Sequence, residues 1–445
     1  MVLEVIKISR VSPATDLVEP LVVPLSFFDL RYIKRSPTER ATFYKTTESS
    51  LVILPKLERS LSLVLAHFLP LSGHLKWDPQ DPKPRIVVFP QQDAVSLTVA
   101  ETDADFSRLS DKGLRPEAEL RGLVPELPSS SDSACLFSLQ ITLFPSQGFC
   151  IGSTAHHVAM DGKTASKFHK SWAHVCKRGT IPQDFILPTL LDRSVINVPT
   201  TLEQRIFQLL PYLSHDNNAR SLKLPPAKET GDDLVRITLE LTQEKVEKLR
   251  ERAKNDSARS DLLHLSTFVV TYAYVWTCMV RARGGYEDRP VRFRYTADFR
   301  DRLDPPVPVT YFGNCTLSID LHGYEAKTFM GEDGFVNGVE ILSDSVKGFG
   351  SRGVESVWEV YEEGTKKMKL GTQMLLVSGS NQFGVYGSDF GWGRPVNTEL
   401  MSIYQNGEFS LSQRRDETSG VEIGICLKKR EMDVFLSLFT NGFDS

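Results

Sequence analysis

Strand-like and helix-like patterns alternate through the first third of the chain. The opening stretch MVLEVIKISRVSPATD alternates apolar and polar residues, as a strand with one buried face does. Residues 57–75 carry apolar side chains at positions 57, 61, 64, 65 and 68, which predicts a helix that PLSG ends. Residues 136–144 and 149–155 are rich in strand formers and flank the turn signal PSQG. Residues 163–177 return to helical spacing, so the pattern predicts an α/β protein.

The regular pattern stops near residue 178 and resumes after residue 230. The intervening sequence is polar and contains several prolines, as in RGTIPQDFILP and SLKLPPAKETGDD. A chain of 445 residues is long enough for two domains. We therefore expect an N-terminal domain at 1–177, a crossover linker at 178–230 and a C-terminal domain at 231–445.

The second half begins with a strand at 234–241 and a helix at 242–253, and a further strand follows at 291–299. The most apolar run of the chain, LSTFVVTYAYVWTCMV at 265–280, lies between them. It is shorter than the ~20 residues of a membrane span and contains hydroxyl side chains. It predicts a helix that is buried on most sides.

Composition and charge point to a soluble metabolic enzyme. Hydrophobic residues make up 41% and charged residues 24% of the chain, and the formal net charge is -4. No basic excess suggests a nucleic-acid partner. No signal peptide pattern is visible, so we expect the cytosol. A reducing compartment also suits the scattered cysteines, none of which forms a C-x-x-C pair: Cys135, Cys150, Cys176, Cys278, Cys315 and Cys426.

The densest candidate chemistry is STAHHVAMDGKT at 153–164, between a predicted strand and a predicted helix. A P-loop would need a glycine five residues before Gly162, where His157 stands. We expect His156 and His157 to be neighbours on the strand, so they face opposite sides of it and at most one can join Asp161 at a metal. A serine nucleophile elbow is excluded, because no glycine in the chain has a serine two residues later.

General base catalysis remains. A histidine at a strand end can reach into a cleft, and the ordinary pKa of about 6.5 suits proton abstraction near neutrality. On this reading Asp161 and Gly162 shape the turn behind His157. A purely structural histidine and aspartate is the alternative. A second segment, GSDFGWGRP at 387–395, has three glycines around one tryptophan, and alone it predicts a tight turn with a buried aromatic ring.

Three motifs in order identify the chain as a member of a known family. His157-Val-Ala-Met-Asp161 followed by Gly162, Tyr311-Phe-Gly-Asn-Cys315 and Asp389-Phe-Gly-Trp-Gly393 resemble the HxxxD, YFGNC and DFGWG signatures of the plant BAHD acyl-CoA-dependent acyltransferases. The resemblance covers nearly the whole chain. It implies an α/β fold of two chloramphenicol-acetyltransferase-like domains with a central solvent channel.

The resemblance also implies site residues. His157 is the expected general base, and Asp389 is the second expected catalytic residue, although a structural role in the DFGWG turn is the alternative. Support of the site is expected from Asp161, Gly162, Trp392 and an arginine partner of Asp161, Arg300 or Arg302. The acyl-CoA donor is expected at Ser266 and Thr267, with an ordinary helix N-cap as the alternative. Donors to the oxyanion or acceptor side are expected at Ser378 and Ser380.

The implied activity is transfer of an acyl group from a coenzyme A thioester. Overall similarity to one branch of the family favours transfer of a hydroxycinnamoyl (coumaroyl) group, with the primary amine of agmatine as the acceptor. The alternative is malonyl or hydroxycinnamoyl transfer to the sugar of a flavonoid or other phenolic glucoside. We expect a monomer with no metal, no cofactor beyond the coenzyme A co-substrate, and no nucleic-acid or membrane partner. A metal-dependent hydrolase and a non-catalytic binding protein are the rival classes.

Overall fold

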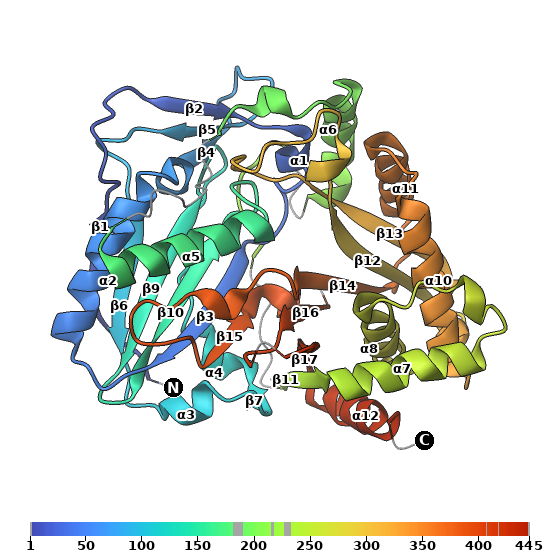
Figure 1. The fold of residues 1–445 in the computed structure, drawn as a ribbon. Coiled ribbons are helices and arrows are strands. Elements are labelled where there is room, and N and C mark those ends of the chain that lie inside the picture. The colour runs from blue at the N-terminus through green and yellow to red at the C-terminus, as the bar shows by residue number, and fades with distance from the viewer. Residues whose placement is uncertain are drawn as a thin grey trace.

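A computed structural model describes residues 2–180, 190–214, 218–226, 233–405, 407–416 and 418–443. Two mixed sheets, each covered by helices, lie side by side (Figure 1). The chain is thus α/β, as the alternating pattern predicts.

The first sheet is built mainly from the N-terminal half. The predicted strands at 136–144 and 149–155 are its central pair, and every one of their residues is buried. This continuous burial reflects cover on both faces of the sheet. Its strand order is β1 (Glu4–Val11), β6 (Val95–Glu101), β9 (Phe137–Phe144), β10 (Gly148–Ala155), β3 (Thr38–Lys45) and β15 (Asn397–Leu400).

Two long helices, α2 (Ser50–Leu65) and α5 (Gly162–Arg178), pack on each other over this sheet (Figure 1). The helix predicted at 57–75 therefore begins seven residues after the observed start of α2 and extends beyond its observed end. Pro55 lies inside α2, although proline normally ends a helix. Beyond α2, PLSG becomes a short 3₁₀ turn, and a small sheet follows in the order β2 (Leu21–Pro24), β5 (Arg85–Val88), β4 (His74–Lys76) and β8 (Ser133–Cys135).

The second sheet is built mainly from the C-terminal half. Its order is β13 (Thr316–Glu325), β12 (Pro290–Asp298), β14 (Gln373–Ser380), β16 (Glu408–Gln413), β17 (Gly420–Lys428), β11 (Leu234–Thr242) and β7 (Arg115–Pro116). The apolar run at 265–280 forms α8 (Thr267–Arg283), which other helices enclose, as its composition predicts. The helices packed around α8 are α7 (Gln243–Asp256), α9 (Lys327–Met330), α10 (Gly334–Phe349) and α12 (Lys429–Asn441).

The predicted crossover at 178–230 is not wholly irregular. It contains α6 (Thr201–Leu213), which packs on α1 (Phe27–Leu30) and α11 (Val354–Lys366). Residues 181–189, 215–217 and 227–230 of the crossover lie outside the described residues. The remaining short helices are α3 (Phe106–Leu109) and α4 (Glu117–Arg121).

Each half contributes an edge strand to the sheet of the other. Strand β15, from the C-terminal half, pairs with β3, and β7, from the N-terminal half, pairs with β11. The two sheets are therefore interlocked rather than merely packed.

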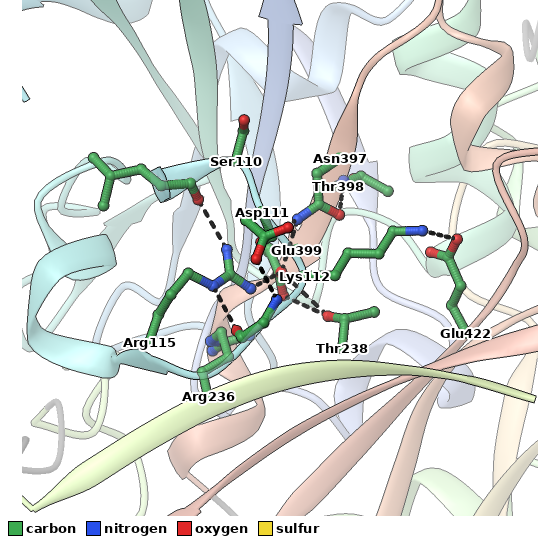
Figure 2. Close-up of polar contacts among 12 residues, drawn as sticks. Ser110, Asp111, Lys112, Arg115, Arg236, Thr238, Asn397, Thr398, Glu399 and Glu422 are labelled. Atoms are coloured by element: carbon green, nitrogen blue, oxygen red, sulfur yellow. Dashed lines mark hydrogen bonds and ion pairs between the residues drawn. The ribbon is translucent and has the colours of Figure 1, made fainter. Parts of the chain in front are cut away.

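A buried ionic cluster links the exchanged strands, and we name it the interdomain clasp. Its members are Arg115, Glu117, Arg236 and Glu399, and Figure 2 labels all of them except Glu117. Arg236 pairs with Glu117 at 2.7 Å and with Glu399 at 3.4 Å, and Arg115 pairs with Glu399 at 2.6 Å. Although burial opposes ionisation of a carboxyl group, the two arginines hold the pKa of Glu399 below its ordinary value. Thr398 and Leu400, beside Glu399, line the central cavity, so the clasp fixes part of its wall.

Candidate active site

A cavity of about 550 Å³ opens between the two sheets. Its lining comes from both halves of the molecule, through β3, β10, β12, β14, β15 and β16 and through helices α5 and α8. Such a cavity is large enough to hold the reacting parts of two small substrates.

His157 lines this cavity from the turn after β10. The expectation that both histidines lie on the strand is wrong, because the strand ends at Ala155 and His156 and His157 lie in the turn that follows. The imidazole stacks on the ring of Tyr32, with centroids 3.7 Å apart and planes within 3°. The hydroxyl of Tyr32 is in turn within 2.9 Å of Thr316 Oγ1, which holds the stacked ring in place.

The two ring nitrogens of His157 differ. Nδ1 is buried and has no hydrogen-bond partner, whereas Nε2 is the nitrogen open to the cavity. Burial lowers the pKa of His157 to about 3, and the nearby cations Arg35 and Arg31 lower it further. The imidazole is therefore neutral near pH 7, which is the form that accepts a proton.

His156 is fully buried and does not line the cavity. Its Nδ1 accepts a hydrogen bond from the backbone N–H of Val158 at 3.2 Å, and burial lowers its pKa to about 4. Among the described residues, no group of three or more potential ligands is arranged to hold a metal ion. The geometry gives His156 a packing role in the turn.

Asp161 sits at the N-cap of α5 and is 2% exposed. Its Oδ1 accepts from the backbone N–H of Thr164 at 3.0 Å, and its Oδ2 accepts from the N–H of Cys315 at 3.2 Å. Arg300 makes the ion pair that we expected of Arg300 or Arg302, at 2.8 Å from Oδ2. Arg302 instead lies over the ring of Phe349. Asp161 thus joins the start of α5 to the YFGNC loop.

Asn314, within YFGNC, holds the backbone of the histidine turn, a role that the sequence did not reveal. Its Nδ2 donates to the carbonyl oxygens of His157 and Val158, each at 3.0 Å, and to Asp29 Oδ1 at 2.9 Å. Asp29 is fully buried and also accepts from Arg193 Nε at 2.9 Å. Asn314 belongs to the recognised YFGNC motif, so its importance could be suspected from the sequence. Its hydrogen-bond partners could not, because they lie more than 150 residues away along the chain.

Gly162 matters for close packing and not for the tight turn behind His157 that we expected of it. It is the first residue of α5 and has no positive φ. A Cβ atom at this position would lie 2.6 Å from Cε2 of Phe383, which lines the cavity. The missing side chain lets a loop of the C-terminal half close on the start of α5.

The structure does not bring Asp389 and Trp392 together with His157. Neither residue lines the cavity. Asp389 accepts from the backbone N–H groups of Gly391 and Gly393 and pairs with Lys177 Nζ at 2.5 Å. These contacts fix the DFGWG turn against the end of α5. Trp392 donates to a glutamate side chain at the surface and packs on Phe149, outside the reacting region.

The other expected contact residues divide into two groups. Ser378 and Ser380 line the cavity, but Ser378 already donates its hydroxyl to Glu408 at 2.6 Å. Ser380 Oγ accepts from a backbone N–H, which leaves its own hydroxyl hydrogen for a substrate oxygen. Ser266 and Thr267 do not line the cavity. Ser266 is an ordinary N-cap of α8, and the hydroxyl of Thr267 accepts from an arginine of α7.

Comparisons with known proteins agree with this geometry. The Transferase family matches residues 1–441. A BAHD acyltransferase of Arabidopsis thaliana is 71% identical over 450 residues, which cover 100% of this chain and 99% of the relative. Agmatine coumaroyltransferase of the same plant is 67% identical over 450 residues, 99% of each chain. Its phenolic glucoside malonyltransferase 2 is 48% identical over 455 residues, 100% of each chain.

Solved structures show the same fold at low sequence identity. Vinorine synthase matches with a TM-score of 0.68 and 18% identity over 98% of each chain. TRI101 of F. sporotrichioides, in complex with coenzyme A and T-2, matches with a TM-score of 0.71 and 16% identity, over 94% of this chain and 97% of its own. The expected two-domain, chloramphenicol-acetyltransferase-like fold is confirmed. With a family match across nearly all of its length, this chain belongs to the BAHD acyltransferases, enzymes that transfer an acyl group from coenzyme A to an acceptor.

Proposed function

We propose that this acyltransferase moves a hydroxycinnamoyl group, with coumaroyl as the expected case, from coenzyme A to the primary amine of agmatine. The observation that carries the proposal is a neutral histidine, with Nε2 open to a cavity between the domains. The identity of 67% to agmatine coumaroyltransferase supports the choice of donor and acceptor.

In this mechanism His157 acts as the general base. The unprotonated amine attacks the thioester carbonyl carbon, a C–N bond forms, and Nε2 takes the proton that the amine releases. The tetrahedral intermediate then collapses, the C–S bond breaks, and the imidazolium returns the proton to the thiolate. Ser380, whose hydroxyl hydrogen is not committed to a described residue, is the proposed donor to the oxyanion.

Asp161, Asn314 and Arg300 position the base without touching the reacting atoms. Their contacts fix the two ends of the turn that carries His157. We place Asp389 in the same supporting class, since its carboxylate is occupied by the DFGWG turn and Lys177.

The cationic end of agmatine requires a carboxylate. Among the described residues, three carboxylates line the cavity: Asp161, Asp298 and Glu408. The side chains of Asp161 and Glu408 are only 2% and 3% exposed, whereas that of Asp298 is 37% exposed. Asp298 is therefore the carboxylate most open to a guanidinium that enters from solvent, and we propose it for that contact.

The test compares acceptors with one donor. Purified enzyme with coumaroyl-CoA should release coenzyme A when agmatine is added, and the product should be the amide. The alternative, transfer to the sugar of a phenolic glucoside, has support from the relative at 48% identity. Release of coenzyme A with a phenolic glucoside and none with agmatine from pH 7 to 9 would refute the choice of acceptor. The cytosolic location and the monomeric state stay predictions from the sequence.

A further inference from the structure

Arg40 stands out among the charged residues of the cavity. It lies on β3, directly opposite Ser153 of β10, and lines the cavity from the same wall as His157. Within the described part of the chain, no hydrogen bond or ion pair engages its guanidinium. The side chain is half-buried and its guanidinium nitrogens stay accessible in the cavity wall, where a ligand can reach them.

The other charges of the cavity have partners. Asp161 and Asp298 pair with Arg300, and Glu408 pairs with Arg35 at 2.5 Å. Arg40 therefore does not complete an ionic network of the protein. Among the described cations that line the cavity, Arg40 is the one whose hydrogen-bond donors are all still available.

His169 and Lys170 both lie close enough to Arg40 to feel its charge. Burial and then the charge of Arg40 lower the pKa of His169 to about 3, and the same two causes lower the pKa of Lys170. The ammonium of Lys170 donates to the carbonyl oxygen of Phe383 at 2.6 Å, so it is already engaged. A cationic acceptor such as agmatine would be repelled here, which places the donor's acyl group, not the acceptor, at this end.

Distance along the sheet selects the kind of acyl group. Ser153, the partner of Arg40, stands two residues before the end of β10 at Ala155. An extended chain rises about 3.4 Å per residue, so about 7 Å of strand lie between Ser153 and the turn that carries His157. The backbone of Arg40 is thus set back from the turn of His157 by about that length of strand. The phenol oxygen of a hydroxycinnamoyl group is at the far end of a rigid, extended acyl chain, whereas the carboxylate of a malonyl group is only two bonds from the carbonyl carbon.

We propose that Arg40 determines donor specificity by donating hydrogen bonds to the 4-hydroxyl oxygen of the hydroxycinnamoyl group. The inference rests on the proposed function, because it requires a hydroxycinnamoyl-CoA donor. The hydroxyl accepts from the guanidinium, and no bond is made or broken at this position. Arg40 is thus a specificity-determining residue that holds the acyl group and leaves the proton transfer to His157.

The experiment varies the enzyme and the donor together. Coumaroyl-CoA and cinnamoyl-CoA differ only in the 4-hydroxyl group, so their dissociation constants isolate its contact. Calorimetry with the wild-type enzyme, Arg40→Met and Arg40→Lys measures them without any acceptor. Arg59→Met, which removes an exposed arginine of α2, controls for the loss of one charge. Thermal unfolding checks that each variant is folded.

Arg40→Met should weaken coumaroyl-CoA about 10- to 100-fold, the usual strength of a hydrogen bond to a charged group, and cinnamoyl-CoA less than about twofold. Arg40→Lys should recover part of the loss. Equal weakening of both donors, or weakening of malonyl-CoA alone, would overturn the role of Arg40. A wild-type enzyme that binds malonyl-CoA but not coumaroyl-CoA would instead refute the proposed function, so the two failures are distinguishable.

Discussion

The pH dependence of the transfer reaction tests whether His157 is neutral in the folded enzyme. Burial, Arg35 and Arg31 lower its pKa to about 3. At pH 5 only about 1% of such an imidazole is protonated, whereas a histidine with the ordinary pKa of about 6.5 is about 97% protonated. Between pH 8 and pH 5 the ordinary base would lose about 30-fold in activity, and His157 should lose almost nothing.

Agmatine adds its own pH dependence, because only the unprotonated amine attacks. An alkylammonium has a pKa near ~10, so the reactive fraction falls tenfold for each unit below it. We therefore expect log kcat/KM to rise with a slope of one from pH 5 to pH 9, without a bend near 6.5. Release of coenzyme A, measured with a thiol reagent under limiting agmatine, gives the profile.

A profile that steepens to a slope of two below pH 6.5 would refute this reasoning, because a second proton would then be lost in the working range. NMR titration supplies an independent check in the free enzyme. The ring resonance of His157, assigned by its absence in His157→Gln, should not titrate above pH 5. A titration midpoint between pH 6 and 7 would mean that water reaches the imidazole of His157 more freely than its burial indicates.

Four substitutions test the site and the interdomain clasp separately. His157→Ala should lower kcat by about two to four orders of magnitude without a change in thermal stability, and activity near wild type in a folded variant would contradict the mechanism. Asp161→Ala and Asp389→Ala should lower both activity and Tm, measured by thermal unfolding, and loss of turnover at unchanged Tm would move either residue into the chemistry. Arg236→Met leaves the fully buried Glu117 without its partner, which costs about 3–5 kcal/mol. With about 2.1 cal/mol/K of unfolding entropy per residue, 445 residues convert this cost to a Tm lower by about 3 to 5 °C, and Arg236→Met with Glu117→Leu should recover part of it.

Local patterns predicted the elements that lie next to the reacting histidine. The strands on either side of PSQG and the helix after Asp161 have nearly the predicted bounds, because each carries its apolar pattern within its own short stretch of chain. Motif resemblance added the identity of the base. Both kinds of information depend on short stretches of chain.

The missed features depend on contacts between distant segments. Strand β15 has four residues and too little pattern to show that it joins the N-terminal sheet. Arg40 reads as a solvent-facing residue of a strand, since sequence alone does not show that a second domain covers it. We listed Asp389 with His157 as a catalytic residue because both lie in family motifs. Membership of two motifs of one family does not show that the two side chains lie close together in the fold.

The position of the base is a property of both halves of the molecule. His157 belongs to the N-terminal half, yet the side chain that holds its backbone carbonyl, Asn314, comes from the C-terminal half. The ion-pair partner of Asp161, Arg300, comes from that half too. Since each half also completes the sheet of the other, a change in their mutual placement must move the turn that carries the imidazole. The first half alone contains the histidine but lacks the groups that hold it where an acyl group and an acceptor meet.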